Sequence, residues 1–395
     1  MPKRRANGEG NICKRKDGRW EGRYTAGYDA NSKAITKNVL GKTQAEVKDK
    51  LRAAIEDSKK LDPVKAGSYT LEQWLKRWYS VYVEPQVRYS TKEFYHNAID
   101  HHIIPKLGSV KLEKLTMLQI QQLYNELRKS GRIQKKNQPE LKEHGLSPRM
   151  VQCVHVVLNK ALEHAVEEKL ILANPAKKCK IPKNTRKEMN ILPEALIGPY
   201  LSAAKEHGIL APMYLELTTG LRRGELLGLE WKDIDFKNRT LTISRTSQYL
   251  PKRGVYTDEP KNKSSRRLVL ISTQVVLILQ EQQRWQAFQA SQLGNGWDPC
   301  GRIITGEDGS PLHPDRLTRW FAKFIQRTDL PPVHIHSLRH TYATLCIAQG
   351  VPITAVAAQM GHANVATTAT IYAHAIKSAQ IAAADKIGGL FEDVL

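Results

Sequence analysis

Residues 336–372, HSLRHTYATLCIAQGVPITAVAAQMGHANVATTATIY, carry most of what the chain reveals about its fold and chemistry. His336 and Arg339 are three positions apart, so they share one face if this stretch is helical. The Gly-Val-Pro sequence at 350–352 predicts the end of that helix, because glycine caps helices and proline commonly follows. A second short helix is expected over residues 351–360. The stretch therefore predicts a helical pair that carries polar side chains.

Four side chains in this stretch suit attack on a phosphodiester. Arg339 is a permanent cation whose planar fork matches two phosphate oxygens. The Tyr372 hydroxyl, with a reference pKa of about 10, attacks poorly unless a base or nearby cations favour the phenolate. His336 and His362 can move a proton near neutral pH. Together these residue types indicate attack by tyrosine, with arginine stabilising the charge that develops.

A second arginine of this kind lies in residues 218–225, TTGLRRGE. Gly220 is expected to end an apolar helix over residues 213–217. Arg222 and Glu225 are three apart at the start of the next helix, which puts a cation at a turn beside a carboxylate able to orient it. This segment predicts the other half of a phosphate clamp.

Four segments, TTGLRRGELLGLEWKDID, PKNKSSRRLVLIS, HIHSLRHTYATL and QMGHANVATTATIYAH, resemble the signature boxes of the tyrosine recombinases. The resemblance is strongest to the integrases of phages and conjugative transposons, and the order Arg, Lys, His-x-x-Arg, His, Tyr matches. The boxes cover roughly the second half of the chain. The N-terminal half matches in architecture rather than in motif.

The resemblance implies a role for each residue of the boxes. Arg222 and Arg339 would clamp the phosphate, with Glu225 in support. Tyr372 would be the nucleophile, His336 a proton acceptor or donor, and His362 a hydrogen-bond partner of a non-bridging oxygen. A lysine on a β-hairpin would protonate the 5′-oxygen leaving group. Lys261 is the expected residue and Lys263 its rival.

The implied reaction is site-specific DNA recombination through a 3′-phosphotyrosine link and a free 5′-hydroxyl. The covalent link keeps the bond energy, so neither a nucleotide cofactor nor a metal is expected. Strand exchange through a four-way junction needs four active sites, which implies a homotetramer on double-stranded DNA with core and arm sites. An excisionase or DNA-bending accessory protein is expected as a further partner. The tail after Tyr372 would dock on a neighbouring protomer or on its own domain.

Composition agrees with a nucleic-acid partner. The chain has 395 residues, a formal net charge of +22 and a pI near 9.7. Such an excess favours a polyanion over a membrane surface, because no basic amphipathic helix stands out. The five cysteines are scattered without a CxxC pair, which favours a reducing compartment. No apolar signal or membrane-spanning segment is evident, so a cytoplasmic location in a bacterial host is expected.

Residues 1–63 predict a three-stranded sheet plus a helix. Strands are expected over residues 11–14, 19–28 and 34–40, and a helix over residues 43–59 with Thr43 and Glu46 as its capping box. A basic sheet can enter the major groove, as arm-site domains do in the resembling family; a packing module is the alternative. The expected DNA contacts are Arg4, Arg5, Lys14, Arg15, Lys16, Arg19 and Arg23.

Residues 64–175 predict a helical bundle, which the resemblance identifies as the core-binding domain. Its helices are expected from Leu71, over residues 90–104 with Pro105 as the stop, over residues 118–129, and from Pro148 to about Leu170. Trp74 and Trp78 are expected in the core, and His101 and His102 on the surface. Lys92, Arg149 and Lys160 are candidate phosphate contacts by charge alone.

Residues 176–189 form a basic linker with many cations, and residues 190–395 the mixed α+β catalytic domain with its tail. Strands are expected over residues 240–245 and 267–271, with residues 254–263 as a basic hairpin tip between them. The expected fold class is thus multidomain and mainly α with small antiparallel sheets. It comprises an N-terminal sheet plus helix, a helical core-binding bundle and a mixed α+β catalytic domain.

Three alternatives stay open. His336 and His340 are four apart and could share a zinc ion, but no Glu base lies between them and no third acidic ligand has suitable spacing. A type IB topoisomerase would use the same chemistry to relax DNA. A silent DNA-binding regulator would bind with steep salt dependence and form no covalent species. Tyr342 competes with Tyr372 as nucleophile, although its apolar helix face favours the core.

Overall fold

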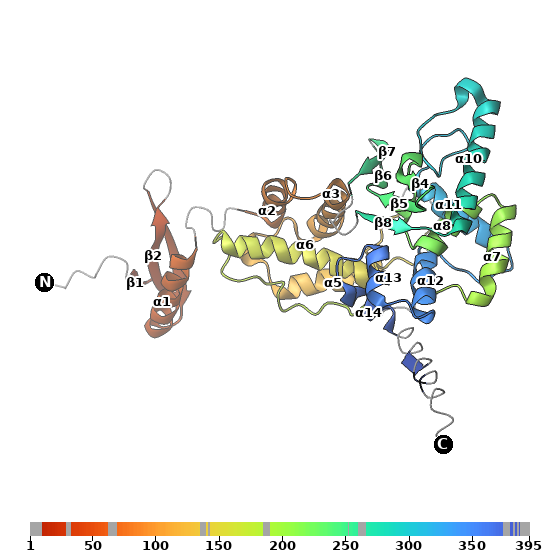
Figure 1. Ribbon diagram of the computed structural model, residues 1–395. Coiled ribbons are helices and arrows are strands. Elements are labelled where there is room, and N and C mark those ends of the chain that lie inside the picture. Colours follow the sequence, from red (N-terminus) through yellow and green to blue (C-terminus); the bar gives the residue numbers. More distant parts are fainter. Residues whose placement is uncertain are drawn as a thin grey trace, which may run out of the picture. The chain divides into compact units, whose positions relative to one another are not determined.

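The computed structural model describes residues 10–28, 33–61, 69–134, 140, 143–184, 190–251, 253–259 and 266–373, with residues 380, 381, 384 and 387. The chain separates into two compact units, Met1–Arg186 and Lys187–Leu395 (Figure 1). Each unit is described by itself below.

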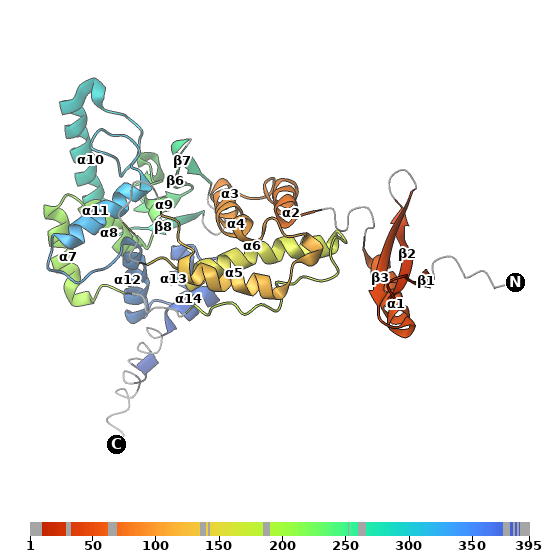
Figure 2. The ribbon, with the colours of Figure 1, turned by 180° about the vertical axis from the view of Figure 1, so that it is seen from behind.

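The first unit begins with an antiparallel sheet in the order β1-β2-β3. Its strands are β1 (Asn11–Lys14), β2 (Trp20–Tyr28) and β3 (Ala34–Gly41), and helix α1 (Gln44–Lys60) covers one face (Figure 2). The helix packs closely because β2 has a glycine there: a Cβ on Gly22 would lie 2.9 Å from Val47 Cγ1. Thr43 accepts a hydrogen bond from the Glu46 amide, as expected, and the Glu46 carboxylate accepts one from the Lys42 amide.

The other face of this sheet is free of the helix and is polar. Glu21 is buried there beneath its neighbours, and it accepts a hydrogen bond from Asn38 at 2.7 Å. Arg23 pairs with it at 3.2 Å and Arg15 at 3.8 Å. Two of the arginines expected to contact DNA therefore project from this face, around a carboxylate that neutralises part of their charge.

A bundle of helices forms the rest of the first unit. Its elements are α2 (Leu71–Trp78), η1 (Tyr79–Val83), α3 (Tyr89–His96), η2 (Asn97–Ile103), α4 (Ile104–Leu107), η3 (Leu112–Lys114), α5 (Met117–Ser130) and α6 (Pro148–Glu167). Trp74 and Trp78 are buried, as expected, and their ring nitrogens are both satisfied by α6. Trp74 donates to the Ala161 carbonyl and Trp78 to His164 Nδ1, each at 2.8 Å. The bundle core is therefore tied to α6 by hydrogen bonds as well as by apolar contact.

Two expectations for the bundle are wrong. Pro105 does not stop its helix, because it lies in the first turn of α4, where the missing amide costs no hydrogen bond. The π-turn η2 carries the chain into α4 without a break. His102 is not on the surface but 8% exposed, and burial lowers its pKa. Both histidines were expected on the surface because neighbouring helix positions cannot share one metal ion, but that argument does not decide which of them faces the core; His101 is exposed and His102 is buried.

The second unit surrounds a core of helices with two small sheets. Its helices are α7 (Glu194–Glu206), α8 (Leu210–Thr219), α9 (Arg223–Leu226), η4 (Trp231–Asp233), α10 (Thr273–Leu293), η6 (Gly294–Gly296), α11 (Pro314–Gln326), α12 (Ile335–Ala348), α13 (Ile353–Met360) and α14 (Val365–Ile371). Its strands are β4 (Ile234–Asp235), β5 (Thr240–Ile243), β6 (Thr246–Leu250), β7 (Gly254–Asp258) and β8 (Arg267–Leu270). The sheet orders are β4-β5-β8 and β6-β7, all antiparallel.

The basic hairpin differs from its expected form. Gly254 begins strand β7 rather than a hairpin tip, and it lies opposite Leu250, the last residue of β6. Residues 260–265, which include Lys261 and Lys263, lie outside the described part of the chain. The sequence pattern missed β6 and β7 because their polar, half-buried residues do not alternate clearly with apolar ones.

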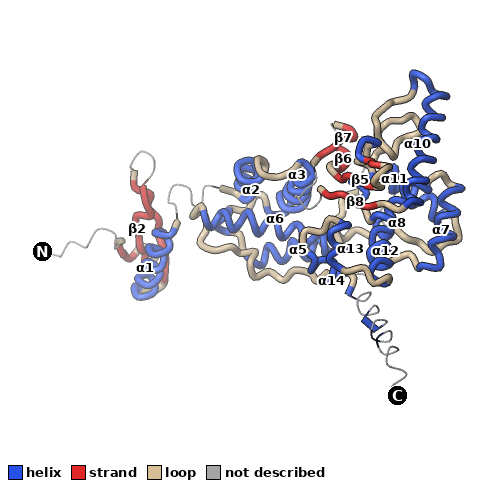
Figure 3. The backbone as a smooth tube through the Cα atoms, viewed as in Figure 1, coloured by secondary structure: helices blue, strands red, loops and turns tan. Residues whose placement is uncertain are grey.

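The expected fold class is confirmed: helices dominate both units, and the sheets are small and antiparallel (Figure 3). Helix α12 lies in the centre of the second unit and packs on α8, with Leu338 fully buried between them. Among the described residues, no helix combines the length and the apolar character needed to cross a membrane. The two arginine-bearing segments thus meet at the α8–α12 contact.

Candidate active site

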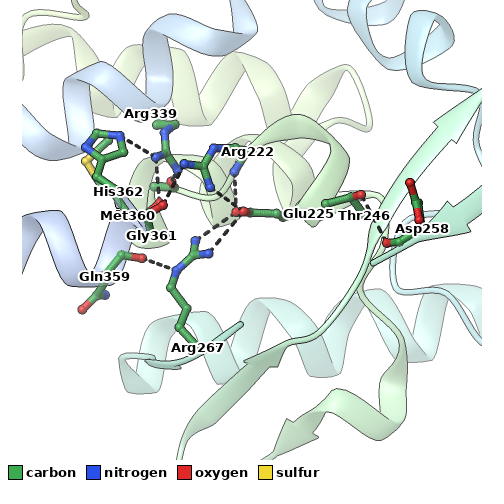
Figure 4. Close-up of polar contacts among 11 residues, drawn as sticks. Arg222, Glu225, Thr246, Asp258, Arg267, Arg339, Gln359, Met360, Gly361 and His362 are labelled. Carbon is green, nitrogen blue, oxygen red and sulfur yellow. Dashed lines mark hydrogen bonds and ion pairs between the residues drawn. The ribbon is translucent and has the colours of Figure 1, made fainter. Parts of the chain in front are cut away.

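Arg222 is held at the turn between α8 and α9. Helix α8 ends at Gly220, whose φ of +61° is in the left-handed region, and a Cβ there would clash with the Tyr342 ring. The turn leads directly to Arg222, the residue that precedes α9. Its guanidinium donates to Glu225 Oε1 at 2.7 Å and to the Gly361 carbonyl at 2.9 Å (Figure 4). The glycine turn therefore aims the first arginine at the end of α13.

Arg339 approaches the same point from α12. Its side chain is almost fully buried, and it donates to the Gly220 carbonyl, to the Met360 carbonyl at 2.7 Å and to His362 Nε2 at 3.0 Å. Burial lowers its pKa to about 10, and the neighbouring Arg222 charge acts in the same direction. It is still a cation at neutral pH. Two guanidinium groups from distant segments thus converge where α13 ends.

Glu225 is the counter-ion of this pair and also binds a third arginine. Its carboxylate is 1% exposed and accepts from the Arg222 amide at 3.0 Å and from Arg267 Nη2 at 2.9 Å. Burial acts to raise its pKa, but the hydrogen bond and charge of Arg267 and the contacts with Arg222 outweigh burial and lower it. The carboxylate is therefore ionised and fixes the orientation of Arg222, which agrees with the expected support by Glu225.

Arg267, at the start of β8, was not singled out from the sequence. Its side chain is only 7% exposed, and besides Glu225 it donates to the Gln359 carbonyl. The sequence signal that could have identified Arg267 was its place in the segment SSRRLVLIS. The neighbouring Arg266 has the same chemistry, so this signal does not tell the two apart. Arg266 is exposed and pairs with Glu259, so only the fold separates the two arginines.

His362 follows the left-handed turn at Gly361 and is bonded through both ring nitrogens. Nε2 lies 3.0 Å from Arg339 Nη2, and Nδ1 lies 2.7 Å from the Thr368 hydroxyl of α14. Burial lowers its pKa to about 4, helped by the charges of Arg339 and Arg222. The ring is therefore neutral at physiological pH, with Nε2 as acceptor and Nδ1 as donor.

Tyr372 ends α14 and is fully buried. It packs in a small cluster with Tyr342, Ile347 and Met360. Its hydroxyl lies 2.7 Å from His340 Nδ1, and burial raises its pKa to about 12. Because no part of the side chain is exposed, a DNA phosphate can reach this oxygen only after the covering residues move.

The remaining candidates, His336, His340 and Tyr342, lie on α12. His336 is exposed on α12, with its ring 4.9 Å from that of His340. Tyr342 is buried, as its apolar helix face predicts, and burial raises its pKa. His340, weighed from the sequence only as a zinc partner of His336, instead contacts Tyr372. Among the described residues, no group of three or more His, Cys, Asp or Glu side chains could hold a metal ion.

Most of the candidate DNA contacts that the structure describes occupy exposed positions. Lys14, Arg15, Lys16, Arg19 and Arg23 are exposed on or beside the N-terminal sheet, and Arg149 and Lys160 are exposed on α6. Arg19 is bonded to Asp17 at 2.8 Å. Lys92 is half-buried and pairs with Glu84 at 3.6 Å. Arg4 and Arg5 lie outside the described residues, as do Lys261 and Lys263.

This arrangement suits an anion. Two converging guanidinium groups held by neutral carbonyls and one carboxylate leave positive charge at the ends of α8 and α13, where fixed donors would stabilise a phosphate in its transition state. The Tyr372 hydroxyl contacts His340, the residue that follows Arg339 in α12. The geometry therefore matches transesterification of a phosphodiester by tyrosine.

Comparison with known proteins bears on the same chemistry. The model of the phage integrase family matches residues 199–378, and that of the N-terminal SAM-like domain of phage integrases matches residues 70–128. The ICEBs1 integrase of Bacillus subtilis is 30% identical over 252 residues, which cover 63% of this chain and 68% of that protein. This chain belongs to the phage integrase family of tyrosine recombinases.

Other relatives span nearly its whole length. A protein named tyrosine recombinase XerC-like, from Caldanaerobacter subterraneus, is 29% identical and aligns with 93% of this recombinase and 95% of its own chain. The integrase of the Tn1549 transposon, solved with transposon right-end DNA, has a TM-score of 0.66 at 22% identity. It aligns with 81% of this chain and 99% of its own. A λ integrase tetramer on a Holliday junction has a TM-score of 0.56 at 17% identity, with 93% and 96% covered. The fold is therefore that of integrases.

Proposed function

We propose that this tyrosine recombinase is a site-specific integrase that inserts and excises a mobile element such as a prophage or conjugative transposon. The observation that carries the proposal is the convergence of Arg222 and Arg339 beside His362, within one unit that also holds Tyr372. The relatives of known name point to the same activity, since they include the integrases of ICEBs1 and of Staphylococcus phage L54a.

In the proposed cleavage step, Tyr372 Oη attacks the scissile phosphorus in line. The Oη–P bond forms and the P–O5′ bond breaks, and Arg222 and Arg339 stabilise the added negative charge. His362 donates from Nε2 to a non-bridging oxygen, which requires the other tautomer or the imidazolium. The Thr368 hydroxyl permits either form, because it can donate to Nδ1 or accept from it. A 5′-hydroxyl from a partner duplex then attacks the phosphotyrosine and releases Tyr372.

The leaving 5′-oxygen needs a proton, and we assign this role to Lys261, with Lys263 as the rival. A substrate with a bridging 5′-sulfur distinguishes them, because a thiolate leaves without protonation. The variant that lacks the proton donor should be slow on the normal substrate and near wild-type on the sulfur substrate. A variant that has lost only a phosphate contact should be equally slow on both.

A nicked suicide duplex that carries the end sequence of the element tests the nucleophile. The wild-type protein should form a covalent adduct that survives denaturing electrophoresis, and Tyr372→Phe should bind the duplex without forming it. Tyr342→Phe is the matched control, because Tyr342 is buried in the same cluster. An adduct in the Tyr372→Phe variant would refute the assignment. Supercoil relaxation without recombinants would indicate a topoisomerase, and binding without any adduct a silent regulator.

The proposal extends to domains and partners. Residues 1–63 would bind arm sites, residues 64–175 would clasp core DNA, residues 176–189 would be the basic linker, and residues 190–395 would carry the chemistry and the tail. The protein would act in the bacterial cytoplasm as a homotetramer on double-stranded DNA, without a cofactor and with an excisionase or bending protein as helper. Truncation after residue 376 tests the tail: loss of tetramers on DNA supports docking in trans, and their persistence argues against it.

A further inference from the structure

The hydroxyl of Tyr372 has a close neighbour, His340, which the sequence suggested only as a possible zinc partner of His336. His340 Nδ1 lies 2.7 Å from Tyr372 Oη, and the two rings are tilted with centroids 5.8 Å apart. Among the described residues, this contact with His340 is the hydrogen bond that the phenolic oxygen of Tyr372 makes. His336 is expected by resemblance to handle protons, but its ring contacts that of His340 edge-on. The nearest base to the nucleophile is therefore His340.

The environment of His340 keeps it ready to accept a proton. Burial lowers its pKa to about 4, and His336 and Arg339 on α12, together with His362, add to this effect. The imidazole is thus neutral, and burial disfavours an ionised Tyr372, so in the tautomer that carries its proton on Nε2 the phenol donates to Nδ1. An approaching phosphate brings negative charge next to Arg339 and the His340 imidazole. That negative charge favours a proton on the imidazole. Basicity would therefore rise when the substrate binds.

We propose that His340 accepts the phenolic proton of Tyr372 during strand cleavage and returns it during rejoining. As the Oη–P bond forms and the P–O5′ bond breaks, the proton moves from Oη to Nδ1, and the 5′-oxygen takes its proton from the separate donor. In rejoining, the 5′-hydroxyl returns its proton to that donor as the P–O5′ bond forms and the Oη–P bond breaks, and the Nδ1 proton goes back to Oη. This role rests on the proposed function, and it leaves His336 free to act at the phosphate.

Helix α12 explains why one element can serve both groups. Arg339 and His340 are adjacent, so their side chains point about 100° apart around the helix. Arg339 reaches the ends of α8 and α13, whereas His340 faces the end of α14. His336 lies one turn before His340 on the same face. The charge clamp and the proton acceptor are therefore set by the same rigid segment.

Single-turnover cleavage of the suicide duplex by the full-length protein tests the proposal. His340→Ala should slow adduct formation by about 100-fold or more, the usual loss for a missing general base. Imidazole added to the reaction should restore at least a tenth of the lost rate, since it fits the space left by the side chain. His340→Asn places an amide near the position of Nδ1, so it should keep the hydrogen bond and the thermal stability but stay slow.

Chain and substrate offer matched controls. His155 on α6 makes a similar bond to the Tyr124 hydroxyl, at 2.9 Å, in the unit that does not hold the candidate active site. His155→Ala should lose stability but keep the rate of adduct formation under saturating protein, and imidazole should not change it. On the 5′-sulfur substrate, His340→Ala should remain slow, because the defect is on the nucleophile side.

The outcomes separate this inference from the proposed function. An adduct in Tyr372→Phe would refute the nucleophile itself. If Tyr372 is the nucleophile but His340→Ala or His340→Asn cleaves within threefold of wild type, His340 is not the acceptor. Imidazole rescue of His336→Ala but not of His340→Ala would assign the proton to His336 and overturn the inference. Should His340→Ala unfold, the folded His340→Asn variant decides the matter through its rate.

Discussion

Replacement of Glu225 by glutamine tests whether a single buried carboxylate holds the active-site arginines. The side chain keeps its size, but the negative charge shared by Arg222 and Arg267 is lost. Arg267 is only 7% exposed, and two of its guanidinium nitrogens donate to the Glu225 carboxylate, at 3.2 Å and 2.9 Å. An uncompensated buried charge costs about 3–5 kcal/mol, and the remaining amide oxygen recovers roughly 1 kcal/mol. We expect Glu225→Gln to destabilise the second unit by about 3 kcal/mol.

This loss can be measured by thermal unfolding. For a unit of this size, about 3 kcal/mol corresponds to a fall in Tm of about 6–12 °C. The effect should shrink at low pH. Because the folded pKa of Glu225 is lowered, its contribution exists above its ordinary pKa and is lost as pH falls through the folded value. Adduct formation on the suicide duplex should also fall, since Arg222 is no longer oriented.

Glu216 provides a matched control on neighbouring helix α8. It is as buried as Glu225, but its Oε2 has no hydrogen-bond partner, and burial raises its pKa well above the usual range. Burial therefore disfavours the charged form of Glu216, so replacement by glutamine should change stability by less than about 1 kcal/mol. Equal losses for Glu216→Gln and Glu225→Gln would refute the reasoning, because charge pairing would then not set the cost.

Three further perturbations have defined outcomes. Arg339→Lys should lower the rate of adduct formation by about 10²–10³-fold and leave DNA affinity within a few-fold of wild type. The reason is that a lysine ammonium is a point charge and lacks the planar two-donor fork of arginine. A rate within fivefold of wild type would contradict this. The urea midpoint of the wild type should fall as pH drops from about 6.5 towards about 4, because unfolded His362 binds a proton that the folded ring resists. The His362→Gln variant should show a weaker dependence of the urea midpoint on pH. An unchanged dependence would argue against His362 as the titrating group. Trp78→Phe should cost about 1–3 kcal/mol in urea unfolding, since His164 loses its donor; no loss would show that the bond is not needed.

The sequence predicted the elements of the site better than their contacts. Gly220 and Gly361 were recognisable as helix ends, and both have positive φ there. The spacing of Arg222 and Glu225 predicted their pairing, which is local. Contacts between distant segments could not be predicted from the sequence. Nothing in the sequence distinguishes Arg267 from Arg266, and the pairing of Arg267 with Glu225 depends on how β8 meets α9.

The same limit explains why His340 was weighed only as a possible zinc partner of His336. Spacing alone made it a partner of His336, since residues four apart share a helix face. The packing of α14 on this helix sends its Nδ1 to Tyr372 instead. In the bundle, the argument that two neighbouring histidines cannot share one metal ion left both on the surface, and the packing of η2 buries His102 instead.

The guanidinium groups at the centre of this molecule are held largely by main-chain oxygens, those of Gly220, Gln359, Met360 and Gly361. A carbonyl is the same group whatever side chain its residue carries. Position 359 can therefore change in sequence without disturbing the clamp, whereas Met360 is buried in the cluster with Tyr372 and the two glycines set the directions of the turns. Such a catalytic frame can be inherited unchanged while the surfaces around it diverge towards new target sites.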